Sequence, residues 1–149
     1  MYPKNFINMI NKQIDDTKFV KIRNTDDNFY IITPSVLFEI THDYDTIETL
    51  DEPTKRLLKT LHIFERSDFE YNYKVADFSV DLFLSSPAEM QKCKWEINGT
   101  LFDGKLLKGC LEKHAVVYIC DEHPHQIVVE SVSYQYRVLI LPINGKGTK

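Results

Sequence analysis

Residues 103 to 120 read DGKLLKGCLEKHAVVYIC, and this stretch decides the fold class. Its first half carries an apolar stripe at the spacing of one helical face, formed by Leu106, Leu107, Cys110 and Leu111. Asp103 stands before the stripe as a candidate N-cap. Residues 115–120 then form a β-branched and aromatic run that is typical of a strand. A short helix that leads directly into a strand indicates an α+β domain.

Downstream of this stretch, the pattern predicts a small antiparallel unit. Residues 121–125 (DEHPH) have turn chemistry, and strands are expected at 126–130 and from about 136 to 143. The helix and its three strands would form one helix–strand unit.

The same order of elements is predicted near the N-terminus. Residues 4–15 form an amphipathic helix, and strands are expected at 19–23, 29–33 and 36–40. Six apolar pairs lie 97 positions apart, for example Val20 and Val117 (117 minus 20). The pairs are Ile10 and Leu107, Ile14 and Leu111, Val20 and Val117, Ile22 and Ile119, Tyr30 and Ile127, and Ile32 and Val129. The sequence therefore predicts a duplicated helix plus antiparallel-strand unit.

The segment between the two units predicts further elements. Asp51-Glu52-Pro53 gives an acidic, proline-containing start, and residues 53–64 carry an apolar stripe at helical spacing, which favours an extra central helix. Residues 69–84 alternate apolar with polar side chains, which predicts two half-buried strands, and 94–97 should be a short strand. We expect one domain over residues 1–144 and a disordered tail at 145–149.

Composition limits the classes of function. The net charge of −4 argues against nucleic-acid binding by the whole surface, so such binding would need a local basic face. The longest apolar runs are far shorter than the roughly 20 residues that cross a bilayer, and no secretory signal is evident. Three cysteines form no paired pattern and are expected to be reduced thiols. These features predict a cytoplasmic protein with no membrane partner.

No catalytic motif is evident, and we therefore predict a protein that is not an enzyme and needs no cofactor or metal. One alternative remains open, a zinc site built from Cys120, His123 and His125, with Cys110 or His114 as a further ligand. Such a site would be structural or would form the centre of a metal-dependent enzyme. The irregular spacing of these residues favours solvated loop histidines and a strand-end cysteine instead.

Lysines on the polar faces of the two predicted helices are the candidate DNA-binding residues. If both apolar stripes pack on one sheet, the opposite faces present cations beside Asn5, Asn8 and Asn11. The candidate residues are Lys4, Lys12, Lys105, Lys108 and Lys113. Such side chains contact phosphates without reading bases. An ordinary solvated helix face is the alternative interpretation.

The region from Trp95 to Ile143 resembles the second half of a bacterial DNA polymerase sliding-clamp domain. The resemblance rests on the strand at 95–98, the paired leucines of the following helix and the closing Leu141-Pro142-Ile143. It implies a single clamp-like domain whose helices face DNA, in a non-enzymatic protein of DNA replication or repair that binds the DNA backbone non-specifically or binds a protein of the replication machinery. Because clamp rings contain six such domains, a ring would need a homo-oligomer.

A second functional hypothesis is a phage or mobile-element interaction module that inhibits a host protein. The middle of the chain supplies an acidic, aromatic surface for such a partner. Its residues are Asp43, Tyr44, Asp45, Glu48, Asp51, Glu52, Glu65, Asp68, Glu70, Tyr71 and Tyr73. Residues 79–83 (SVDLF) also resemble a clamp-binding peptide, although the alternating pattern favours a strand there.

Overall fold

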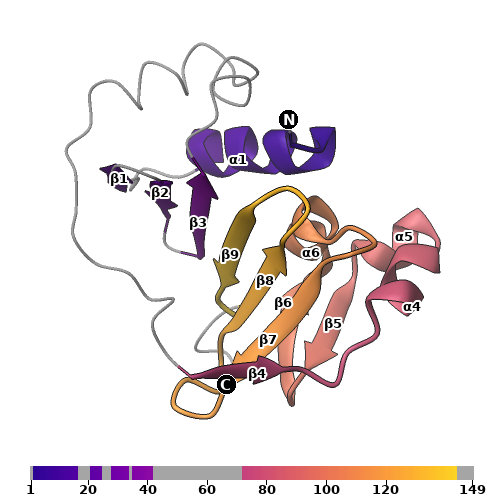
Figure 1. The fold of residues 1–149 in the computed structure, drawn as a ribbon. Coiled ribbons are helices and arrows are strands. Elements are labelled where there is room, and N and C mark those ends of the chain that lie inside the picture. The colour runs from indigo at the N-terminus through magenta and orange to yellow at the C-terminus, as the bar shows by residue number, and fades with distance from the viewer. Residues whose placement is uncertain (1, 17–20, 25–27, 34, 42–71, 144–149) are drawn as a thin grey trace.

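The computed structural model describes residues 2–16, 21–24, 28–33, 35–41 and 72–143. These residues form an α+β fold in which helices pack on an antiparallel sheet (Figure 1), as the sequence predicts. The helices are α1 (Lys4–Asp16), α4 (Val80–Ser85), α5 (Ala88–Gln91) and α6 (Gly104–Cys110). The predicted central helix at 53–64 and the tail at 145–149 lie outside the described residues.

A seven-stranded sheet has the order β1-β2-β3-β9-β8-β7-β4. Its strands are β1 (Lys21–Asn24), β2 (Asn28–Ile32), β3 (Val36–Thr41), β4 (Tyr73–Val75), β7 (Val116–Cys120), β8 (Ile127–Ser131) and β9 (Tyr136–Ile140). Both predicted hairpins are confirmed, because β1 pairs with β2 and β7 pairs with β8. At the centre, Phe38 of β3 lies opposite Val138 of β9, so the first and second helix–strand regions share one sheet.

Two helices cover the same face of this sheet, which we call the inner face. Phe6 and Ile10 of α1 and Leu107 of α6 are fully buried there with Phe38 and Val138. The helical stripes predict this burial, because each places its apolar residues on one side. The other face, the outer face, holds a separate buried group of Tyr30, Leu37, Val128 and Leu139.

The 97-position correspondence is wrong in the second strands. Tyr30 belongs to the outer-face group, whereas its predicted counterpart Ile127 is fully buried on the inner face. The same conflict separates Ile32 from Val129. Ile22 pairs with Ile31, whereas its counterpart Ile119 pairs with Ile127, so the connection between β7 and β8 is one residue shorter between equivalent positions. A one-residue slip of register reverses the face of every side chain.

The predicted strand at 78–84 is also wrong, because this segment forms helix α4. The Ser79 side chain accepts a hydrogen bond from the backbone N–H of Leu82 and caps the helix. Phe83 is fully buried, whereas Leu82 is 61 % exposed. The alternation of apolar residues therefore comes from a short surface helix that buries one aromatic ring.

A further hairpin, β5 (Lys94–Ile97) with β6 (Thr100–Asp103), leads into α6. The sequence predicts β5 but not β6. Asn98 and Gly99 both have positive φ, 56° and 76°, as the turn between two such strands requires. The turn sets where β6 begins. Because α6 follows β6 without a loop, the hairpin also positions the start of α6.

No helix among the described residues is long and apolar enough to cross a membrane.

Candidate functional site

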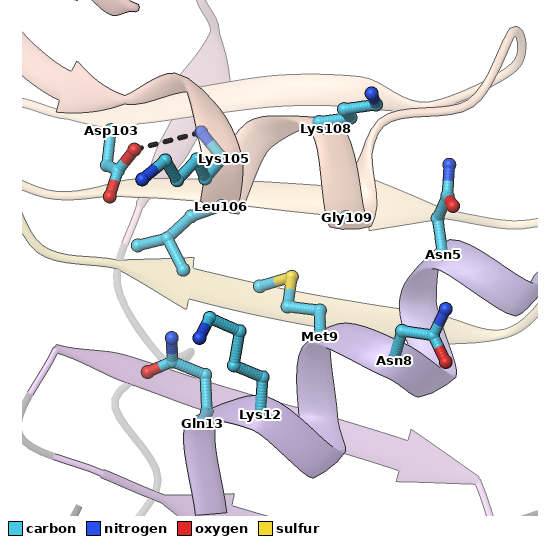
Figure 2. Close-up of a pocket in the computed structure, with 10 residues that line it drawn as sticks. All are labelled: Asn5, Asn8, Met9, Lys12, Gln13, Asp103, Lys105, Leu106, Lys108 and Gly109. Atoms are coloured by element: carbon cyan, nitrogen blue, oxygen red, sulfur yellow. Dashed lines mark hydrogen bonds between the residues drawn. The ribbon is translucent and has the colours of Figure 1, made fainter. Parts of the chain in front are cut away.

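A groove of about 460 Å³ runs between α1 and α6 (Figure 2). The two helices contact each other although about 90 residues separate them in the chain. The groove is lined by Asn5, Asn8, Met9, Lys12, Gln13, Asp103, Lys105, Leu106, Lys108 and Gly109. It thus combines cations, amides and an apolar strip at the meeting point of two helices.

Helix α1 supplies all three of the described amide side chains that line the groove, Asn5, Asn8 and Gln13. Asn5, Asn8 and Lys12 follow one another at intervals of about one turn, so they lie along one side of the helix. Phe6 and Ile10 occupy the opposite side and are fully buried against the sheet. Burial of this apolar side fixes the rotation of α1 and leaves the polar side chains facing the groove.

Helix α6 supplies two of the cations. The Asp103 carboxylate accepts a hydrogen bond of 2.9 Å from the backbone N–H of Lys105, which caps the helix as predicted. Leu107 and Cys110 are fully buried, so Lys105 and Lys108 emerge on the other side, one turn apart. Within the described part of the chain, neither lysine forms an ion pair.

Gly109 allows the two helices to approach closely. A Cβ atom at this position would lie 2.3 Å from the Met9 sulfur and 2.7 Å from the Met9 Cβ. Any larger residue would therefore push α1 and α6 apart. The Met9 side chain lies across this contact and, with Leu106, forms the apolar floor of the groove (Figure 2).

The charge of the groove is positive. Among the residues whose positions the structure describes, Lys12, Lys105 and Lys108 line the groove, and Asp103 is the one acidic lining residue. Lys105 and Lys12 lie toward the end near Leu106, whereas Lys108 lies toward the end that carries Asn5 and Asn8 (Figure 2). Cations therefore stand at both ends of an apolar middle section.

The structure brings three of the five predicted lysines together. Lys4 is exposed at the start of α1 but does not line the groove. Lys113 lies on a different groove, beside Val75, Phe78 and Val116. The reason is that α6 ends at Cys110, so the helical spacing used to place Lys113 does not extend that far.

Two of the candidate zinc ligands, Cys120 and His125, have side-chain contacts with residues outside that group. Cys120 Sγ contacts the Glu122 carboxylate at 3.4 Å, and His125 Nδ1 lies 3.3 Å from the Thr100 hydroxyl. No group of three or more potential metal ligands forms among the residues with described positions, so Cys120, His123 and His125 do not assemble a zinc site there.

The two predicted protein-binding segments have different outcomes. The acidic, aromatic middle lies outside the described residues except for Tyr73, whose hydroxyl accepts a hydrogen bond from the Gln126 amide. The peptide-like segment 79–83 is folded into α4, where Phe83 packs against Trp95 with ring centroids 4.9 Å apart. Its aromatic side chain is therefore not available as an extended peptide.

Comparison of the chain with protein-family models, curated proteins and solved structures gives no match. The groove is therefore interpreted from its own chemistry. It offers cations and neutral amides around an apolar floor, and the residues with described positions hold no nucleophile–base pair at its surface. This chemistry suits binding of an anionic ligand.

Sequence reasoning missed Met9, Gln13, Leu106 and Gly109 as lining residues. The helical pattern indicates which side each helix buries, but it does not indicate which helices become neighbours. The available signal is Gly109, because a glycine inside a predicted helix indicates a close approach by another element.

Proposed function

We propose that the protein is a clamp-like, non-enzymatic protein of DNA replication or repair that binds the DNA backbone through the α1–α6 groove. The observation that carries this proposal is the convergence of Lys12, Lys105 and Lys108 from two helices on one sheet face. Asn5, Asn8 and Gln13 add amide donors, which also contact phosphate oxygens.

The arrangement of the sheet supports the clamp-like part of the proposal. The boundary between β3 and β9 separates two units of one helix and three strands, α1, β1, β2, β3 and α6, β7, β8, β9, and β4 adds a strand beside β7. The two helices lie side by side on the inner face. A duplicated clamp-type domain has this arrangement, with its helices toward DNA.

Binding to a labelled DNA duplex, measured by fluorescence anisotropy over a range of salt concentrations, tests the proposal. Three lysine–phosphate contacts predict a slope of about −3 in log K against log salt. The double variant Lys105→Glu/Lys108→Glu should reduce affinity at least tenfold, about the effect of losing two charge-assisted contacts.

Lys92→Glu/Lys113→Glu is the matched control, because it makes the same charge change at two exposed lysines outside the groove. Equal losses for both double variants would indicate attraction to net charge alone. Circular dichroism on each variant would show that the fold is retained. Unchanged affinity for the groove variant would remove the proposed site.

The oligomeric part of the proposal has its own measurement. Encirclement of DNA by single-domain subunits requires a closed homo-oligomer, so light scattering of the full chain should give a multiple of 17.5 kDa. A monomer would eliminate encirclement and leave binding through the groove to be judged from the anisotropy data.

A further inference from the structure

The floor of the groove has a chemistry that contact with a phosphate backbone does not use. Met9 and Leu106 are 7 % and 9 % exposed, and both line the groove between its cationic ends. A duplex presents phosphates and sugars on its outside and keeps its bases stacked within, so it would leave this floor uncovered.

We propose that the groove takes an unstacked base of single-stranded nucleic acid, with neighbouring phosphates on Lys108 at one end and on Lys12 and Lys105 at the other. This inference rests on the proposed function, because it needs the same lysines. It adds which form of nucleic acid the groove prefers.

The size and shape of the groove support a base rather than a phosphate alone. A volume of about 460 Å³ falls in the range of small-molecule sites, roughly 300 to 1,000 Å³. A phosphate held by surface lysines needs no such cavity. The Gly109–Met9 contact keeps the floor in place, because Met9 lies where any side chain at 109 would be.

The lining residues also match the two chemical parts of a nucleotide. The polarisable Met9 thioether makes favourable contacts with the ring of a planar aromatic group. Asn5, Asn8 and Gln13 present amides, which can donate to and accept from the polar edge of a base. The lysines at the ends remain for the phosphates.

An abasic strand separates this inference from simple backbone binding. The probes are a labelled single strand, the same strand with abasic sites throughout its central part, and the matching duplex, each titrated by anisotropy at one salt concentration. The intact strand should bind about fivefold or more tightly than either other probe, which is the lower end of the range for one stacked base.

A double variant in α1 tests whether the base binds at the amides of the groove. The exposed residues Asn5 and Asn8 can be changed together to alanine without removing charge or core contacts. Asn5→Ala/Asn8→Ala should weaken binding of the intact strand and leave the abasic strand unchanged, because the inference assigns these amides to the base and the phosphates to the lysines. An equal loss on both probes would assign the amides to phosphates and overturn the inference.

Every other outcome also decides between the claims. Equal affinity for intact and abasic strands, with binding still lost in Lys105→Glu/Lys108→Glu, would overturn the inference and leave the proposed function standing. Absence of binding to all three probes would remove both. Tighter binding of an oligoglutamate peptide than of the intact strand would identify the groove as a site for an acidic protein segment and overturn the inference.

Discussion

The two faces of the seven-stranded sheet are stabilised in different ways. The inner face is continuous apolar packing under α1 and α6, with Phe6, Phe38 and Val138 fully buried. The outer face mixes apolar residues with a charged row: Tyr30 donates a hydrogen bond to Glu39, and Arg137 Nη2 donates to Glu39 Oε2 at 2.9 Å. These three residues lie opposite one another on β2, β3 and β9. The inner face is therefore stabilised by apolar burial, whereas the outer face also carries an ion pair.

The largest expected effect is on the inner face. Phe38→Ala removes a fully buried ring that packs edge-on against Phe6 at 5.9 Å, in the middle of the β3–β9 pair. We expect the free energy of unfolding to fall by about 3 to 5 kcal/mol. Urea denaturation of the variant and the wild type measures the difference. A loss below about 1 kcal/mol would show that the inner face does not carry the stability assigned to it.

The second-largest expected effect is a fall in the free energy of unfolding at alkaline pH, caused by two buried groups on the inner face. Burial raises the pKa of the Cys110 thiol and of the Tyr136 hydroxyl, which donates to the Cys110 carbonyl. Both groups are neutral when folded and ionise more readily when unfolded, so their stabilising effect is complete below about pH 9 and falls as the pH rises. Each group contributes a slope of about 1.4 kcal/mol per pH unit once its unfolded form ionises.

Urea denaturation between pH 8 and 11 measures this slope. Cys110→Ala should move the onset of the loss from near the thiol value of 9.0 to near the tyrosine value of 10.0. An unchanged onset in this variant would assign the alkaline loss to other groups.

Substitution of the ion pair on the outer face should have the smallest effect on stability, and a second substitution should restore most of the loss. Glu39→Met leaves Arg137 without its carboxylate partner, at a cost of about 1 to 2 kcal/mol, because the Arg137 side chain is 36 % exposed and water compensates in part. Adding Arg137→Met should restore most of the stability, since two apolar residues can replace an ion pair. A double-mutant cycle in urea measures the coupling. Additive losses would show that the pair is not coupled.

The sequence predicted the inner face better than the outer one. Helical stripes and strand alternation placed α1, α6 and both hairpins, because burial of apolar residues imposes those periods. The pairing of Glu39 with Arg137 could not be predicted, since it depends on β3 lying beside β9, and nearly 100 residues separate these strands. The same limit applies to the groove, whose two walls come from opposite ends of the chain.

Local signals were also misread in two places. Phe78 to Leu84 alternates like a strand, but Ser79 is a helix cap and the segment has no partner strand among the described residues. Asn98-Gly99 is among the strongest short signals for a hairpin, and it marks the turn between β5 and β6. In both cases one or two residues decide the local structure, through a side-chain hydrogen bond at Ser79 and through positive φ at Asn98 and Gly99.

Strand β4 has a consequence for self-association. It pairs with β7 at Tyr118, Ile119 and Cys120, so the chain itself occupies the edge along which another molecule could add a strand. The substitute edge is only three residues long, and its central residue, Lys74, forms an exposed ion pair with Asp121. Short, charged edges discourage the growth of sheets from one molecule to the next. A strand added to β7 from another molecule would therefore have to displace β4.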